Sequence, residues 1–462
     1  MLAKFKKKYI GDWDFYQKYL LLAIPMILQN AITNLVSFLD NIMVGQLGTE
    51  QMSGVAIVNQ LIFVYNLAIF GAVSAASIFG AQYFGKGNHK GHMYSFRFKL
   101  YATLLVTGGA ILLFLTKGSA LISLYLTDTV GNGATDLALQ YGLEYLAIMM
   151  VGLIPFAVNQ SYATNIKETG QTLIPMLASF VAVGTNAILD YLMIFGIGPF
   201  PELGVQGAAL ATVIARYIEA LIVVIWAHIH RGKNRYLEGA YTGFGIPLAE
   251  LKAILIKGFP LMMNEVMWAA GMTTVTQCYS VRGLDVVAGL NIASTITNLF
   301  NIVYLQLGSC ISIVVGQYLG AGKLEDAKDA DNKMIVFSVF CCVIMAALMF
   351  VVGGFFPGIY NTTEEIRELA TSFIAVSAII MPFCAFSHAS YFTLRSGGKT
   401  VVTFLFDSVF TWVIVVPAAY LLAHFTGLGI VSIYFLVQGT ELIKVIIGYL
   451  MVKSNVWVVQ MV

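Results

Sequence analysis

Residues 24–48 read IPMILQNAITNLVSFLDNIMVGQLG, an apolar run that holds one carboxylate, Asp40, near its end. A run of this length can cross a membrane, because a spanning helix needs about 20 apolar residues. Residues 259–283 read FPLMMNEVMWAAGMTTVTQCYSVRG, and they align with 24–48 without a gap at an offset of 235. The alignment continues to residues 87 and 322, where QYFG at 82–85 falls on QYLG at 317–320. The chain therefore contains an internal repeat that begins with a membrane helix.

Two further blocks extend this repeat. KETGQT at 167–172 falls on RSGGKT at 395–400 at an offset of 228, and Glu219 falls on Glu441 at an offset of 222. We therefore expect two six-helix lobes, residues 1–235 and 236–462. Since six is even, both lobes enter the membrane from the same side, which relates them by a pseudo-two-fold axis along the membrane normal. Parallel repeats of this kind place a substrate site between the halves and work by alternating access.

Composition indicates a membrane protein. Of the 462 residues 58% are hydrophobic and 11% charged, with a mean hydropathy of +0.81, whereas soluble domains have about 25% charged residues. The five cysteines lie in apolar runs without metal-ligand spacing, so we expect no metal site and no cofactor. We predict an all-α polytopic protein in the lipid bilayer, which does not bind nucleic acid. Its twelve transmembrane helices are expected near 19–44, 53–81, 98–118, 137–161, 172–197, 205–230, 253–280, 286–316, 332–353, 367–393, 400–424 and 427–452.

Basic residues are distributed asymmetrically between the loops. Of 26 Lys and Arg, all but Lys117, Arg216, Arg282 and Arg367, that is 22, lie at the two termini or in even-numbered loops. Among them are Lys4, Lys6, Lys7 and Lys8. The positive-inside rule therefore places both termini in the cytoplasm and predicts a multi-pass protein of the plasma membrane.

Charges inside predicted spans are expensive and mark candidate functional sites. Arg216 with Glu219, and Glu441 with Lys444, are spaced to neutralise each other on one helix face. Four other carboxylates lack such a partner, and the repeat does not reproduce them, which favours function over a shared scaffold role. They are Asp40, Asp190, Glu265 and Asp407, which fall opposite Val275, Ala418, Asn30 and Ser179.

Four polar residues are expected to converge in the outer part of the N-terminal lobe. Asp40 and Asp190 lie close to the outer ends of their spans, Asn186 is one turn before Asp190, and Thr212 lies early in the sixth span. Two carboxylates in a site of low dielectric cannot both ionise cheaply. The cluster can therefore hold one proton, or one hard cation such as Na⁺ through oxygen ligands.

The remaining titratable groups leave alternatives open. Glu265 can bind an ion or face the positive charge of a substrate in the C-terminal lobe. Asp407 lies near Lys399 and Arg395, so it either pairs with them or has a functional role. His388 fits a hydrogen-bonded packing role better than a titrating one.

The stretch Gly398-Lys399-Thr400 looks like the end of a nucleotide-binding P-loop. Thr393, however, occupies the position where that motif requires its first glycine. With no enzyme motif found, we predict a protein that is not an enzyme and draws on an ion gradient.

At this point the sequence resembles the bacterial type of the multidrug and toxic compound extrusion (MATE) family. The resemblance rests on DNIMVGQLG at 40–48, the QYFG and QYLG motifs, NAILDY at 186–191 and LGVQGAALAT at 203–212. It implies a V-shaped pair of six-helix bundles, usually monomeric, that exports amphiphilic and often cationic compounds. It also implies a cation or proton site at Asp40, Asn186, Asp190 and Thr212, and a role for Glu265. Phe373–Thr393 contains no acidic residue, which argues against a paired carboxylate site in the C-terminal lobe.

We therefore predict a secondary antiporter that exports small organic molecules in exchange for H⁺ or Na⁺. The alternative is a flippase for lipid-linked saccharides with a related architecture. It would need a broadly cationic cavity, and only Arg216 and Lys444 lie at depth. The coupling ion, the substrates and the stoichiometry stay open at this point.

Overall fold

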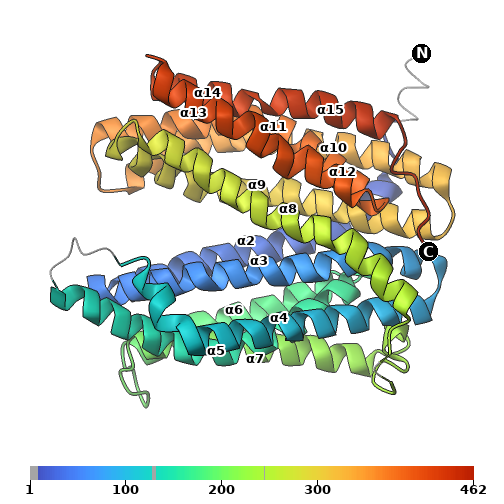
Figure 1. Cartoon of the computed structure of the whole chain (residues 1–462), viewed down its shortest axis with the longest axis horizontal. Helices are drawn as coiled ribbons and strands as arrows, with labels where there is room; N and C mark the ends of the chain where they lie inside the picture. Colours follow the sequence, from blue (N-terminus) through green and yellow to red (C-terminus); the bar gives the residue numbers. More distant parts are fainter. Residues whose placement is uncertain (1–8, 127–131, 244) are drawn as a thin grey trace. The chain divides into compact units, whose positions relative to one another are not determined.

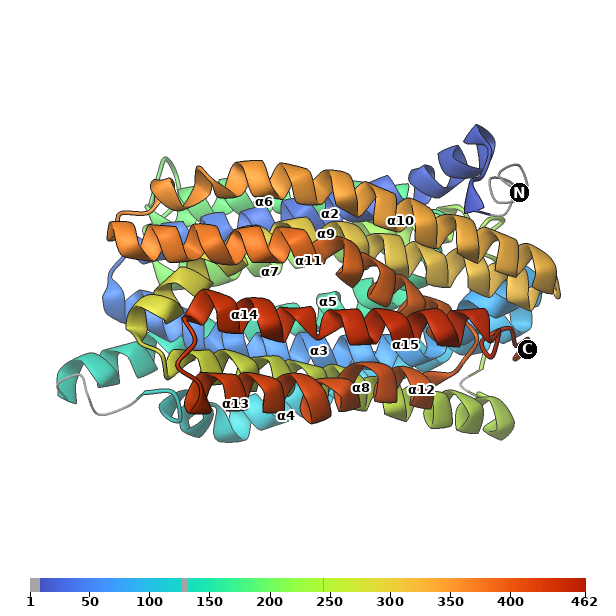
Figure 2. The ribbon, with the colours of Figure 1, turned by 90° about the horizontal axis from the view of Figure 1, so that it is seen from above.

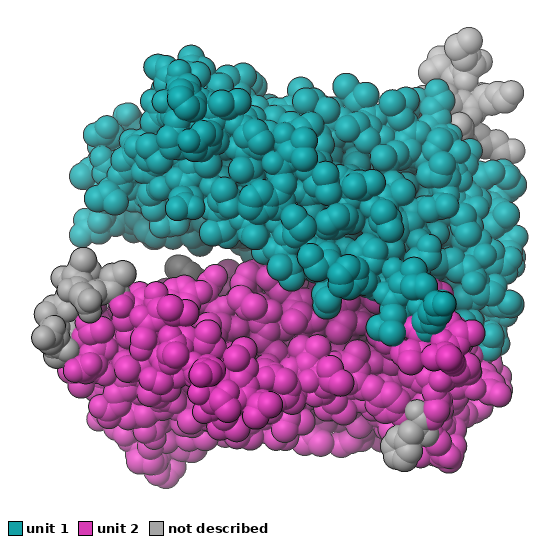
Figure 3. Space-filling view, viewed as in Figure 1, with its two compact units in different colours: residues 1–23, 81–88, 252–462 teal, residues 24–80, 89–251 magenta. Residues whose placement is uncertain are grey.

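The computed structural model describes residues 9–126, 132–243 and 245–462. Lys4, Lys6, Lys7 and Lys8, which contribute to the predicted charge asymmetry, lie outside these ranges. All regular structure in the described ranges is helical, as Figure 1 and Figure 2 show. Two compact units divide the chain and are coloured separately in Figure 3. Unit 1 comprises residues 1–23, 81–88 and 252–462, and unit 2 comprises 24–80 and 89–251.

Unit 2 contains long helices packed around an apolar core. The core includes Tyr65, Tyr145, Leu146, Met149 and Leu153, each with at most 5% of its surface exposed. Tyr65 is also anchored within it, because its hydroxyl donates to the Leu153 carbonyl oxygen at 3.0 Å. The helices that contribute are α2 (Trp13–Gly45), α3 (Thr49–Lys86), α4 (His89–Ser123), α5 (Asn132–Glu168), α6 (Leu173–Ile194) and α7 (Val205–Ile229), followed by the short η1 (Arg235–Leu237).

Unit 1 contains the second set of helices, around a core that includes Phe300, Phe373, Ile374 and Met381. Its last two spans are not regular. Residues 400–425 form one span interrupted by two π-helical stretches, and residues 430–453 form one span broken at Thr440. The elements are α8 (Leu248–Ser280), α9 (Leu284–Gly320), α10 (Leu324–Gly353), η2 (Phe356–Ile359), α11 (Glu364–Ser396), α12 (Thr400–Phe404), η3 (Leu405–Val409), η4 (Thr411–Val415), α13 (Val416–Phe425), α14 (Ile430–Gly439) and α15 (Glu441–Lys453).

The compact units differ in detail from lobes divided at residue 235. The junction lies between Leu251 and Lys252, and the beginning of α2 and the end of α3 belong to unit 1. Local packing holds the beginning of α2 in unit 1. Tyr16 stacks on Phe337 of α10 with ring centroids 4.7 Å apart, and the Tyr19 hydroxyl donates to the Leu307 carbonyl oxygen of α9 at 2.8 Å.

The repeated QYFG and QYLG motifs meet inside unit 1. A Cβ atom added to Gly85 would lie 2.0 Å from the Gln317 carbonyl oxygen, and one added to Gly320 would lie 1.9 Å from that of Gln82. The two backbones therefore approach so closely that only glycine fits at both positions. Gln82 reinforces the junction, because its Nε2 atom donates to the Ser396 carbonyl oxygen at 2.9 Å.

Eleven helices in the described part of the chain are long and apolar enough to cross a membrane. The one predicted span absent from this set is α8, which has sufficient length, 33 residues, but carries Lys252, Lys257 and Glu265. Large apolar side chains are extensively exposed, among them Leu105 at 77% and Leu284 at 86%, as expected where lipid is the solvent. The predicted all-α polytopic membrane fold is thus confirmed. Lys99, counted with the loop charges although it lies at the edge of the predicted span 98–118, is wholly buried within α4.

We expect Gly85→Ala and Gly320→Ala each to destabilise the protein by about 1–3 kcal/mol, because the added methyl group overpacks a backbone contact. Gly108→Ala is the matched control, since no atom lies within 4 Å of a Cβ added there. Thermal melting in detergent measures the effect. Equal melting temperatures for the three variants would show that the glycine contact does not hold unit 1 together.

Candidate ion site and buried charges

Asp40 of α2 and Asp190 of α6 form a carboxyl pair in unit 2. Asp190 is fully buried, and Asp40 is partly buried. Neither Oδ atom of Asp190, nor Oδ1 of Asp40, has a hydrogen-bond partner of ordinary geometry among the described residues. The two carboxyl groups nevertheless interact with each other, and Asn186 interacts with Asp190 from one turn earlier on α6. The pair is therefore poised to take up a proton or a cation.

Asn186 and Thr212 extend this pair onto α7. The Asn186 Nδ2 atom donates to the Thr212 Oγ1 atom at 3.4 Å. Asp40 lies five residues before the end of α2, Asp190 four before the end of α6, and Thr212 seven after the start of α7. The chain therefore brings all four predicted residues to the same end of unit 2.

Sequence reasoning missed one member of this environment. Tyr145 of α5 is 5% exposed and lies within electrostatic reach of Asp40, Asp190 and Arg216. Its hydroxyl donates to Asn59 Oδ1 at 3.3 Å. An uncharged aromatic residue in an apolar span gives no signal in a search for charges, so only the folded structure identifies it.

Glu265 belongs to unit 1 and has a different environment. It lies on α8 and is partly buried, and Arg395 and Asp407 are the charged groups that act on it. Its neighbours therefore include one positive and one negative charge, unlike those of the Asp40–Asp190 pair.

Asp407 pairs with Lys444 rather than with Lys399 or Arg395. The Lys444 Nζ atom lies 2.6 Å from Asp407 Oδ1, and their side chains are 8% and 14% exposed. The Asn264 Nδ2 atom donates to Asp407 Oδ2 at 3.1 Å. Asp407 thus has a built-in cationic partner, which answers the question that the sequence left open.

The two pairs expected along single helices do not form among the described residues. Lys444 binds Asp407, and Glu441 Oε1 is buried with no hydrogen-bond partner in the described part of the chain. The Arg216 guanidinium lies 5.2 Å from the Phe156 ring centre and donates to the Gly152 carbonyl oxygen at 3.4 Å. Partners on neighbouring helices offered these cations better geometry than a residue one turn away on the same helix.

His388 packs as the sequence suggested. Its Nδ1 atom lies 2.9 Å from the Cys384 carbonyl oxygen, and its ring lies against Tyr304 with centroids 4.7 Å apart. A second buried cluster was not predicted, because Lys99, at the edge of a predicted span, was counted with the loop charges. The Lys99 Nζ atom lies 2.5 Å from Glu168 Oε1 and 2.8 Å from Asn165 Oδ1.

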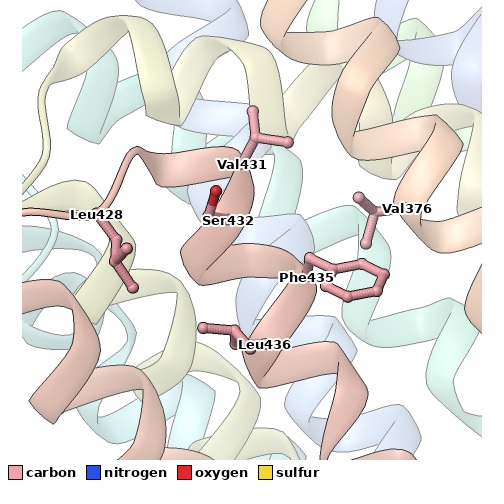
Figure 4. Close-up of a pocket in the computed structure, with 6 residues that line it drawn as sticks. All are labelled: Val376, Leu428, Val431, Ser432, Phe435 and Leu436. Carbon is pink, nitrogen blue, oxygen red and sulfur yellow. The ribbon is translucent and has the colours of Figure 1, made fainter.

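A cavity of about 380 Å³ opens between α11 and α14 in unit 1 (Figure 4). Five apolar side chains and one hydroxyl line it, and none of them titrates, so the cavity offers no ion chemistry. The lining residues are Val376, Leu428, Val431, Ser432, Phe435 and Leu436.

We expect Asp407→Asn and Lys444→Met each to cost about 3–5 kcal/mol of stability, since each leaves one buried charge without its partner. The double variant should be less destabilised than the sum of the two, which thermal melting of all four proteins in detergent tests. Strictly additive losses would show that the 2.6 Å contact contributes no coupling energy.

Comparison with known proteins places this geometry in a family. The family model MatE matches residues 25–192 and 260–421. The probable multidrug resistance protein NorM of Thermotoga maritima is 23% identical over 413 residues, which cover 89% of this chain and 86% of that protein. The protein of the same name from Halalkalibacterium halodurans is 24% identical, with 89% and 88% covered.

Solved structures agree with the fold. A MOP superfamily transporter from Pyrococcus furiosus superimposes with a TM-score of 0.85 at 20% identity, over 96% of both chains. The outward-facing structure of a multidrug resistance MATE family transporter gives the same TM-score, identity and coverage. Because the family model matches well over half of the sequence, this chain belongs to the MatE family of multidrug efflux transporters.

Proposed function

We propose that this protein is a secondary active antiporter that exports amphiphilic, often cationic, organic compounds in exchange for H⁺ or Na⁺. In this proposal Asp40, Asn186, Asp190 and Thr212 form the coupling site. The observation that carries it is the Asp40–Asp190 pair, since Asp190 is fully buried and no basic side chain within the described ranges forms an ion pair with either carboxyl group.

The physical argument is one of charge compensation. An isolated carboxylate in the bilayer interior costs several kcal/mol, and two that share a site cost more. At Asp407 and Glu168 the compensation is built in, since Lys444 neutralises Asp407 and Lys99 neutralises Glu168. The Asp40–Asp190 pair lacks such a cation, so a proton or a metal cation from solution must supply the charge. A site that takes its counter-charge from solution couples naturally to an ion gradient.

An ion gradient provides enough energy for export. One elementary charge that moves through 100 mV releases about 2.3 kcal/mol. At about 1.4 kcal/mol for each factor of ten, this sustains roughly a 50-fold gradient of a neutral substrate. Exchange of one H⁺ for a monovalent organic cation moves no net charge, and would depend on the pH gradient instead.

Two further features support export of organic compounds over transport of lipid-linked saccharides. A pyrophosphate-linked substrate needs buried cations that are free to bind it. Lys444 and Lys99 are engaged by carboxylates, and Arg216 lies against the Gly152 carbonyl oxygen and the Phe156 ring. Glu265 adds a carboxyl group in unit 1, where we propose an accessory role in binding an ion or a cationic substrate.

We expect Asp40→Asn and Asp190→Asn to abolish gradient-driven movement of a fluorescent organic cation in proteoliposomes, because neither amide can take up the counter-charge. Glu144→Gln is the matched control, since Glu144 is a partly exposed carboxylate of α5 that bonds only to glutamine side chains among the described residues. A pH gradient and a Na⁺ gradient are imposed in separate experiments to name the ion. Wild-type rates in Asp40→Asn under both gradients would reject this site.

For the location we propose the plasma membrane, with both termini in the cytoplasm. A cysteine placed at exposed Lys233 should then react with a membrane-impermeant thiol reagent only after the cells are opened, whereas one placed at exposed Pro201 should react in intact cells. The five native cysteines are replaced first. The reverse pattern of labelling would contradict the proposed orientation.

A further inference from the structure

A second polar cluster lies in unit 2, where α6 contacts α7. It lies farther from the ends of these helices than the cluster that contains Asp190 and Thr212. The Ser179 hydroxyl of α6 donates to the Glu219 carboxylate of α7. The Gln29 Nε2 atom of α2 donates to Ser179 Oγ at 2.7 Å. The same three helices that carry Asp40, Asp190 and Thr212 thus bring a third carboxyl group together with two neutral oxygen-bearing side chains.

The two clusters lie at different depths along the contact between α6 and α7. Ser179 precedes Asn186 by seven residues, and Thr212 precedes Glu219 by seven. Seven residues are close to two helical turns, so both positions lie on the same face of their helix, about 10 Å apart. The Asn186–Thr212 and Ser179–Glu219 hydrogen bonds therefore join the same two helices at two depths.

The internal repeat supplies a comparison for the deeper cluster. At offsets of 235, 228 and 222, Gln29, Ser179 and Glu219 fall on Asn264, Asp407 and Glu441. One of its hydrogen bonds is repeated, because Asn264 donates to Asp407 as Gln29 donates to Ser179. In unit 1, however, Lys444 stands next to these carboxylates and forms an ion pair with Asp407.

Glu219 has no equivalent of Lys444. The repeat position of Lys444 is Ile222, and no described residue forms an ion pair with Glu219. Arg216 is the charged group nearest along α7, and it interacts with Glu219 only at long range, because its guanidinium is engaged by Gly152 and Phe156. Gln29 Oε1 is buried and has no hydrogen-bond partner in the described part of the chain. A carboxylate and an unused amide oxygen thus stand where the other repeat carries a fixed cation.

We propose that Gln29, Ser179 and Glu219 form a second cation site, for H⁺ or Na⁺, which is filled together with the Asp40–Asp190 site along the contact between α6 and α7. This inference rests on the proposed antiport function. Hard cations prefer oxygen ligands of the kinds these three side chains offer. In unit 1, the Lys444 ammonium group permanently occupies the place that the exchangeable cation takes here.

The test counts bound cations in purified protein held in lipid nanodiscs. Binding of radioactive Na⁺ is measured at fixed pH, and uptake of H⁺ after a pH step is measured without Na⁺. We expect Glu219→Gln to bind one cation fewer than the wild type in whichever experiment shows binding, Asp40→Asn also to bind one fewer, and the double variant to bind two fewer. Glu144→Gln should bind the wild-type number.

A second variant keeps the inference testable if Glu219→Gln does not fold. Ser179→Ala retains the carboxylate but removes its hydrogen bond, so it should keep the cation count and bind about tenfold more weakly. An unchanged count in folded Glu219→Gln, or unchanged affinity in Ser179→Ala, would overturn the second site and leave the Asp40 site intact. An unchanged count in Asp40→Asn together with a reduced count in Glu219→Gln would reject the proposed coupling site instead.

Discussion

Charge compensation in the bilayer is the constraint on which the rest of this structure depends. Each buried carboxylate must find a positive partner or accept a cation from solution, because an isolated charge costs several kcal/mol. Asp407 and Glu168 have Lys444 and Lys99 within 2.6 Å and 2.5 Å. Asp40 and Asp190 lie in a cluster with Asn186, Thr212 and Tyr145, and no described residue forms an ion pair with either carboxyl group. This difference separates charges that stabilise the fold from charges available for transport.

The internal repeat gives the chain two halves with corresponding helices and motifs. Where both halves need the same geometry, the residues are the same, as at Gly85 and Gly320, whose close approach no side chain would permit. Where they differ, as between Ser179 and Asp407 or between Ile222 and Lys444, the difference lies in buried charge. The two halves therefore share their helical scaffold but differ in which buried carboxylates have a cationic partner.

Much of the fold could be predicted from the sequence, because long apolar runs and glycine motifs are local signals. The Asp40, Asn186, Asp190 and Thr212 cluster was also predictable, since helical rise fixes the depth of each residue. Partners across helices were not. The expected Glu441–Lys444 and Arg216–Glu219 pairs gave way to Lys444–Asp407 and to Arg216 on Phe156, because side-chain direction between packed helices is set by tertiary contacts. Buried Lys99 was missed because it was counted with the loop charges, and Tyr145 because an uncharged aromatic residue in an apolar span gives no signal.

The most direct test of ion-coupled export imposes a gradient of the substrate and measures the movement of the ion. Proteoliposomes are prepared with no ion gradient, and a gradient of a fluorescent organic cation is imposed while internal pH and Na⁺ are followed with separate dyes. Coupling is reciprocal, so we predict that substrate moving in one direction drives H⁺ or Na⁺ in the other, and that this ion movement disappears in Asp40→Asn. Substrate movement without any opposing ion movement in the wild-type protein would contradict the account.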